Sequence, residues 1–133
     1  MQINPYLIFD GTCREAFTAY EKVLGGKAHL MPYGDAPPSG GPAQPADHIM
    51  HAHLDAAGAV LMGSDGPRGD GAKDAVFVSI SVDDTAEAER IFRELAEGGT
   101  VVMPIGETFW AARFGMLKDR FGVSWMVNCS TPH

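Results

Sequence analysis

The sequence has little cysteine, no long apolar run and no basic segment at its start. Its two cysteines, Cys13 and Cys129, form no CxxC pair, so we expect free thiols in a reducing compartment rather than a disulfide framework or a cysteine metal site. No segment approaches the roughly 20 apolar residues of a membrane span, and no basic stretch precedes an apolar one at the start of the sequence. We therefore expect a cytoplasmic protein with no membrane partner.

Clusters of basic residues are also missing. Lys and Arg number 10 against 17 Asp and Glu, which gives a formal net charge of −7. No Lys/Arg run interleaved with aromatic residues is available to neutralise a phosphate backbone, and this excludes nucleic acid as an expected partner. What the chain does have is 45% hydrophobic residues over 133 positions, enough for one ordinary core. We expect a single domain covering residues 1–133.

The first half of the sequence predicts a strand followed by a helix. Residues 3–9 are apolar and run into the turn signal Asp10-Gly11. Thr12 and Glu15 have the spacing of a capping box, in which the Thr hydroxyl accepts the Glu amide and the carboxylate returns to the Thr amide. Apolar residues then recur at helical spacing until Gly25-Gly26, a pair suited to a helix C-terminus.

The second half repeats this pattern. Residues 75–82 predict a strand, Asp84 and Glu87 a second cap, residues 88–95 a helix with one apolar stripe, and Gly98-Gly99 its end. Further strands are expected at 28–33, 49–54, 59–64, 100–105, 108–117 and 123–128. The matching order indicates an internal duplication. We predict an α+β fold with two βαβββ repeats, residues 1–66 and 67–133, that form a curved mixed sheet.

Alternation in the second half suggests which residues line a cavity. Phe77 and Ser79 alternate with aliphatic residues, so they should project from the face that no helix covers, and Met126 should do so on the last strand. The aromatic run 107–115 is the leading ligand-contact segment, with Trp110 as an anchor and Arg113 able to hold a carboxylate or phosphonate through two hydrogen bonds. The same aromatics could instead belong to the core or to a subunit interface, with Arg113 in solvent.

Three histidines, His48, His51 and His53, lie close together in the first half. His51 and His53 project from one face of a predicted strand, a spacing that lets two imidazoles share a metal, although two imidazoles alone make a poor site. Hydrogen-bonded or exposed histidines are the alternative. His51 is also the candidate catalytic group, since imidazole suits proton transfer near neutral pH. Asp65 fits a turn or cap residue better than a catalytic acid.

Several motifs resemble one known family. They are Pro5-Tyr6-Leu7, Cys13-Arg14-Glu15-Ala16, His51-Ala52-His53-Leu54, Leu61-Met62-Gly63-Ser64-Asp65, residues 107–111 and residues 119–128. Together they resemble the PhnB-like branch of the vicinal oxygen chelate superfamily, which includes glyoxalase I, fosfomycin-resistance proteins, extradiol dioxygenases and bleomycin-binding proteins. Members often carry a 3-demethylubiquinone methyltransferase label. The chain has no Gly-rich strand-to-helix loop for adenosylmethionine, so we do not expect that activity.

The resemblance also implies where a metal would bind. Enzymes of the superfamily hold a divalent ion with residues that correspond here to Pro5 or Tyr6, Leu61 or Met62, Phe77 or Ser79, and Met126. Almost none of these is a metal ligand, because hard divalent ions require carboxylate, carbonyl, water or imidazole donors. We therefore expect no metal ligands at these positions and no cofactor, while an unconventional divalent metal site stays open.

Three functions follow from the sequence. The first is a homodimer, as the resemblance implies, that binds a small, perhaps anionic, organic molecule in apolar pockets lined by Tyr6, Met62, Ser64, Phe77, Ser79, Trp110, Arg113 and Met126. The second is a metal-dependent lyase, isomerase or transferase of glyoxalase type that uses His51 and His53. The third is sequestration of a drug or metabolite without chemistry. The sequence does not decide between an enzyme and a binding protein.

Overall fold

The computed structural model describes residues 4–35, 44–66, 76–108 and 110–129. The chain divides into two compact units, Met1–Asp70 and Gly71–His133, here called the first and second unit. The first contains β1 (Tyr6–Phe9), α1 (Cys13–Leu24), β2 (Lys27–Pro32), the short 3₁₀ helix η1 (Tyr33–Asp35), β3 (Ile49–Ala56) and β4 (Ala59–Asp65). The second contains β5 (Val78–Val82), α2 (Thr85–Ala96), β6 (Thr100–Gly106), β7 (Arg113–Lys118) and β8 (Ser124–Cys129).

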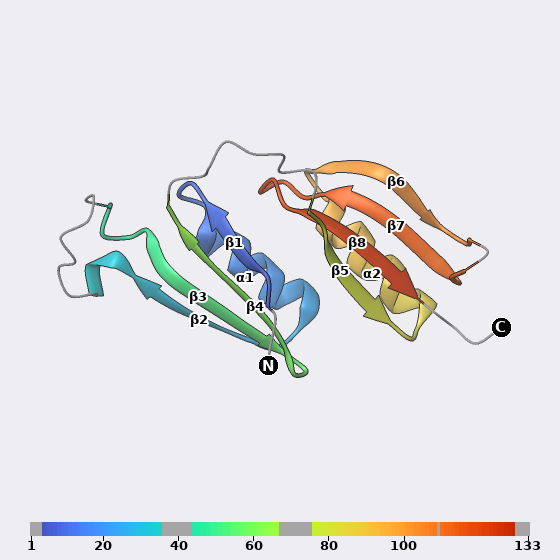
Figure 1. Ribbon diagram of the computed structural model, residues 1–133, viewed down its shortest axis with the longest axis horizontal. Helices are drawn as coiled ribbons and strands as arrows, with labels where there is room; N and C mark the ends of the chain where they lie inside the picture. Colours follow the sequence, from blue (N-terminus) through green and yellow to red (C-terminus); the bar gives the residue numbers. More distant parts are fainter. Residues whose placement is uncertain (1–3, 36–43, 67–75, 109, 130–133) are drawn as a thin grey trace. The chain divides into compact units, whose positions relative to one another are not determined.

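The two units have the same topology. Each has a four-stranded sheet, in the order β1-β4-β3-β2 or β5-β8-β7-β6, with a helix against it (Figure 1). The pairs β1–β4 and β5–β8 are parallel, and all other neighbours are antiparallel. This confirms the predicted α+β fold of two βαβββ repeats with mixed sheets. No helix within the described ranges is long and apolar enough to cross a membrane.

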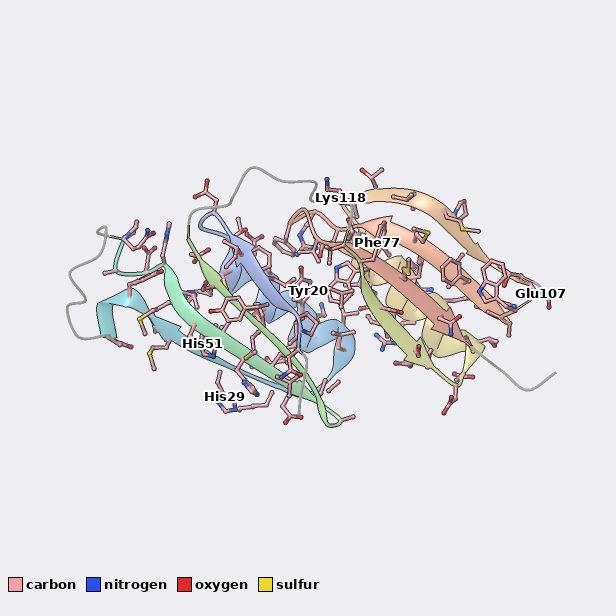
Figure 2. All side chains as sticks on the ribbon, viewed as in Figure 1. Tyr20, His29, His51, Phe77, Glu107 and Lys118 are labelled. Carbon is pink, nitrogen blue, oxygen red and sulfur yellow. The ribbon has the colours of Figure 1, made fainter. Side chains whose placement is uncertain are left out.

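Each helix buries its apolar stripe against one face of its own sheet. In the first unit, Phe17 of α1 makes edge-to-face contacts with Phe9 and with Tyr20, at ring-centroid distances of 6.2 and 5.8 Å. All three rings are essentially inaccessible to solvent (Tyr20 is labelled in Figure 2). In the second unit, Ala88, Ile91, Phe92 and Leu95 are the buried residues of α2. Both stripes are those that the helical spacing predicted.

The N-terminus of α1 is not held as predicted. Thr12 makes no side-chain capping bond. Instead, Oδ1 of the buried Asp65 accepts the amides of Gly11 at 2.9 Å and Cys13 at 3.0 Å. A carboxylate 52 residues away in sequence therefore replaces the local cap. This confirms Asp65 as a capping residue.

The N-terminus of α2 follows the prediction more closely. Oδ2 of Asp84 accepts the Glu87 amide at 3.1 Å, as a capping residue should. The Glu87 carboxylate, however, binds the Arg90 guanidinium at 2.6 Å, and this hydrogen bond lowers the pKa of Glu87. The predicted bond from the Glu87 amide to the Asp84 carboxylate is thus confirmed, while the Glu87 carboxylate binds Arg90.

The double glycines end both helices at equivalent places. A Cβ atom added at Gly26 would overlap the Asp55 carbonyl of β3, and one added at Gly99 would overlap the Lys118 carbonyl of β7. In both units, the chain that leaves the helix therefore passes so close to the third strand that no side chain fits. This shared contact supports the internal duplication.

Candidate functional site

Within the described ranges, no helix of the same unit covers one face of each sheet, and the glycines inside the strands identify that face. A Cβ at Gly63 would lie 2.8 Å from the Phe17 ring of α1, so Gly63 and its aligned neighbours face the helix. Because side chains alternate along a strand, Met62 and Ser64 project from the opposite side. We call this side the first open face.

Tyr6 and Met62 are direct neighbours on the first open face. They are aligned in the β1–β4 pair, and Tyr6 is 45% exposed. Ser64 is aligned with Ile8 in the next row and is 8% exposed. The structure therefore brings together three of the residues predicted to contact a ligand.

His51 joins this group. Its Nδ1 atom lies 3.3 Å from the Tyr6 hydroxyl, and the two rings are 5.9 Å apart between centroids (His51 is labelled in Figure 2). The alignment of Ala52 with Gly63 places Ala52 on the helix side, so His51 and His53 lie on the first open face. Tyr6 is therefore the residue that can orient the imidazole of His51. No sequence feature identified this partner.

The second unit has a corresponding open face. Gly115 of β7 faces Phe92 of α2, since an added Cβ would lie 2.7 Å from that ring. Gly115 is aligned with Val127, so the neighbouring residue Met126 projects away from the helix. Met126 is aligned with Ser79 on one side and with Met116 on the other. We call this side the second open face.

The second open face is rich in thioether and aromatic groups. Met103, Met116 and Met126 are aligned in turn across three neighbouring strands, and Ser79 completes the row. Phe77 directly precedes β5 and is half-buried (Figure 2). The predicted residues Ser79 and Met126 therefore lie side by side. The same row contains Met103 and Met116, which the sequence did not single out.

Trp110 is half-exposed and packs on the second unit's β7. Its ring meets Phe114 edge to face at 5.5 Å, and 50% of its surface remains accessible. Phe114 adjoins Gly115 and is aligned with Asn128, so it belongs to the second open face. An exposed tryptophan against an open aromatic ring is the arrangement that stacking ligands use.

The strand predicted over residues 108–117 begins only at Arg113. Before it, Thr108 and Ala111 close a turn, in which the Thr108 hydroxyl accepts the Ala111 amide at 3.1 Å. Phe109, part of the predicted ligand segment, lies outside the described residues. The turn separates Trp110 from the regular alternation of β7, so strand parity could not place it.

Arg113 is on the helix side of its sheet. It alternates with Phe114 and shares the side of Gly115, and its Nε donates to Oε1 of Glu89 on α2 at 2.7 Å. This bond raises the pKa of the guanidinium, which also donates to the Ala112 carbonyl. The structure therefore does not bring Arg113 together with Met126 and Ser79.

A cation that does lie on the second open face is Lys118, aligned with Ser124.

Two further residues on the first open face were not predicted. His29 is aligned with His53, and Met31 with His51, across the β2–β3 pair. The alternation of residues 27–32 could have placed them on one side of a strand. Which residues of β3 face His29 and Met31 depends on the register of the strand pair, and a sequence pattern alone does not give that register.

Neither cysteine is a reactive nucleophile candidate at the open faces. Both thiols are free and buried. Burial, assisted by the negative charge of Asp65 and opposed by Arg14, raises the pKa of Cys13 to about 12. The Cys13 thiol therefore stays protonated at neutral pH and serves as an apolar core group.

The residues at the metal positions implied by the resemblance do not fit a hard divalent ion. Tyr6 with Met62, and Ser79 with Met126, are aligned pairs that offer a phenol, two thioethers and a hydroxyl. Within the described part of the chain, no three His, Cys, Asp or Glu side chains form a group that could hold a metal ion. A glyoxalase-type centre is therefore not supported at these positions.

Comparison with known proteins places the chain in a family. Residues 1–128 match the family described as 3-demethylubiquinone-9 3-methyltransferase. Protein YjdN of Escherichia coli is 34% identical over 96% of this chain and 95% of its own length. The crystal structure of protein PA1353 from Pseudomonas aeruginosa is 51% identical, with a TM-score of 0.88 and 99% coverage of both chains.

More distant structures share the fold. The PhnB protein from Bacillus cereus is 24% identical, covers 97% of this chain and 99% of its own, and gives a TM-score of 0.79. A glyoxalase/bleomycin resistance protein/dioxygenase family enzyme from Burkholderia phytofirmans is 12% identical. The match covers 96% of each chain and has a TM-score of 0.62. These likenesses agree with the fold of two βαβββ repeats.

Proposed function

Because the chain belongs to this family, in the PhnB-like branch of the vicinal oxygen chelate superfamily, we propose that it binds a small organic molecule with an apolar, aromatic body. The observation that carries the proposal is the half-exposed Trp110 packed on Phe114 beside the methionine row. Aromatic and thioether groups contribute dispersion and stacking without fixing one orientation, so they suit a flat apolar ligand. The ligand would lie on the second open face.

The charge on this face favours an anionic ligand. Lys118 projects from the second open face, next to the row that contains Met116 and Met126. Arg113, the cation expected from the sequence, is engaged by Glu89 on the other side of the sheet. A carboxylate or sulfonate on the ligand would be attracted by the positive charge of Lys118 on this face.

Binding without methyl transfer is the better match to these residues. Within the described residues, each unit has one α-helix and a largely antiparallel sheet, whereas adenosylmethionine is typically held at the carboxyl ends of parallel strands. The proposal therefore needs no cofactor. It includes sequestration of an apolar metabolite as one biological use of the same site.

The Tyr6–His51 contact favours one catalytic alternative. With Nδ1 engaged by the Tyr6 hydroxyl, the imidazole has a defined orientation and a second nitrogen for proton exchange with a ligand. We propose His51 as the proton-transfer group if the bound molecule is converted. This role requires no metal.

We also propose a cytoplasmic homodimer. The outer strand β6 exposes Val101, Val102 and Met103 by 46%, 57% and 37% of their surfaces, consecutive residues that point to both sides of a sheet edge. An apolar strand edge of this kind is favoured when a second chain covers it.

The ligand proposal is tested with 1-anilinonaphthalene-8-sulfonate, an aromatic anion whose fluorescence rises in apolar sites. We expect saturable binding to the native protein, and Trp110→Ala should weaken it by about two- to tenfold, because one stacking partner is worth roughly 0.5–1.5 kcal/mol. Val76→Ala is the matched control, since Val76 is 73% exposed and precedes β5. Fluorescence titration measures both affinities.

Urea denaturation of the same variants separates binding from folding. The proposal expects Trp110→Ala to keep its unfolding midpoint. Equal binding by Trp110→Ala and the parent protein would contradict it, and so would a large loss of stability, because Trp110 would then be a core residue.

A further inference from the structure

The first open face carries imidazole groups on two neighbouring strands. His29 of β2 is directly aligned with His53 of β3 in an antiparallel pair (Figure 2 labels His29 and His51 on these strands). Aligned partners project from the same side of a sheet with Cβ atoms about 5 Å apart. His53 alternates with the helix-facing Ala52 and Leu54, which are 0% and 1% exposed, so both imidazoles lie on the side away from α1.

We infer that His29 and His53 form a binding site for a borderline transition-metal ion, with Cu²⁺ as the best fit among divalent ions. Two imidazoles at this separation can turn one nitrogen each toward a shared ion. Imidazole prefers copper, nickel and zinc to magnesium and calcium, and affinity in the series is highest for Cu²⁺.

The nearest neighbours of the pair are soft thioethers. Met62 is aligned with His53 on the β4 side, and Met31 follows His29 by two positions on β2. Thioethers select Cu⁺ rather than Cu²⁺, so the preference for Cu²⁺ rests on the two imidazoles and on the affinity order of the divalent ions. Water would complete the coordination of the ion.

Solvent access agrees with this site. His29 is exposed and His53 is half-buried, so an ion from solvent can reach both rings. Asp55 follows His53 on the same side of β3, but it is aligned with Lys27 of β2, so these two charges offset one another beside the pair.

The pair is distinct from the positions where the superfamily resemblance implies a metal. Those positions lie on β1, β4, β8 and at the start of β5, whereas His29 and His53 lie on β2 and β3. The pair belongs to the first unit, whereas the aromatic ligand site is proposed on residues of the second. It therefore does not rest on the proposed function.

Isothermal titration of the full-length, tag-free protein with Cu²⁺ tests the inference. We expect one ion per chain, and His29→Gln and His53→Gln should each weaken binding by about tenfold or more, because a lost ligand costs at least as much as a lost second-shell partner. His48→Gln is the matched control: the ring of His48 lies beside Gly11, where an added Cβ would be 3.3 Å away, and not in the His29–His53 row.

Electron paramagnetic resonance of the Cu²⁺-loaded protein supplies the second readout. We expect nitrogen hyperfine splitting from two imidazoles, reduced in either variant. Absence of stoichiometric binding, or equal affinity in His29→Gln and the parent, would overturn the site. Naphthalene-sulfonate binding should not change in His29→Gln, so failure of the metal site and failure of the ligand site give different results. Because His29 is exposed, this variant should fold normally.

Discussion

Asp65 ties together three segments of the first unit. Its carboxylate accepts the amides of Gly11, Cys13 and Ile49 at 2.8–3.0 Å, and only 1% of the residue is exposed. The buried amides of Cys13 and Ile49 would lack a partner without it, because water does not reach them, whereas Gly11 is exposed and its amide can bind water instead. The position that looked like a turn residue in the sequence is thus a central element of the unit's stability.

Asp65→Asn should destabilise the protein by about 3 kcal/mol, because an amide group would present its own N–H to backbone donors and remove charge-assisted bonds. Urea denaturation measures the change. Asp55→Asn, on an exposed aspartate with one 3.3 Å bond to Gly58, should change stability by less than about 1 kcal/mol. Similar losses in the two variants would show that the three amides do not depend on Asp65.

At the scale of elements, the two helices begin differently although their sequences look alike. Asp84 caps α2 through the Glu87 amide, whereas Thr12 makes no such bond and α1 relies on Asp65. The sequence pattern therefore located both helices and assigned one of their two caps correctly.

Asp84→Ala should lower the free energy of unfolding by about 1 kcal/mol, the usual cost of a lost N-cap. Thr12→Ala should change it by less than about 0.5 kcal/mol, since the Thr12 side chain makes no capping bond. Chemical denaturation of both variants under one set of conditions gives the comparison. If Thr12→Ala lowered the free energy of unfolding as much as Asp84→Ala, Thr12 would be a capping residue after all, as the sequence predicted.

Sequence periodicity predicted the helices and most strands because alternation and helical spacing are local signals. It placed Ser79 and Met126 on the side away from the helix and His51 with His53 on one side of a strand, as the structure does, while Tyr6 and Met62 were identified through the family resemblance. It could not tell which amides Asp65 caps or pair His29 with His53, since both contacts join residues distant in sequence. Arg113 was grouped with the aromatic residues of its segment, although alternation with Phe114 puts it on the side of Glu89.

At the scale of the whole molecule, duplication is visible in packing as well as in order. Gly26 and Gly99 make the same close approach to the third strand of their units, a match that neither helical nor strand periodicity requires. The open faces differ, however: the first carries imidazoles beside its thioethers, whereas the second combines thioethers with phenyl and indole rings. One architecture therefore carries two chemically different surfaces.

The proposed homodimer predicts that Val102→Lys weakens self-association by about tenfold or more, because a buried apolar contact is replaced by a charge. Sedimentation equilibrium measures the association constant. Val76→Lys serves as control, since Val76 is exposed but lies outside β6. A monomeric parent protein, or unchanged association in Val102→Lys, would contradict an interface at this edge.

The placement of the aromatic residues has an optical consequence. All three tyrosines, Tyr6, Tyr20 and Tyr33, lie in the first unit, and both tryptophans, Trp110 and Trp125, lie in the second. The indole of Trp125 is 1% exposed and donates to Asp119 at 2.8 Å, so its emission reports the folded interior of its own unit. Tryptophan emission, excited where tyrosine does not absorb, thus reports the second unit alone, and a denaturation followed both by this emission and by far-ultraviolet circular dichroism of the whole chain reveals whether the two units unfold in a single step.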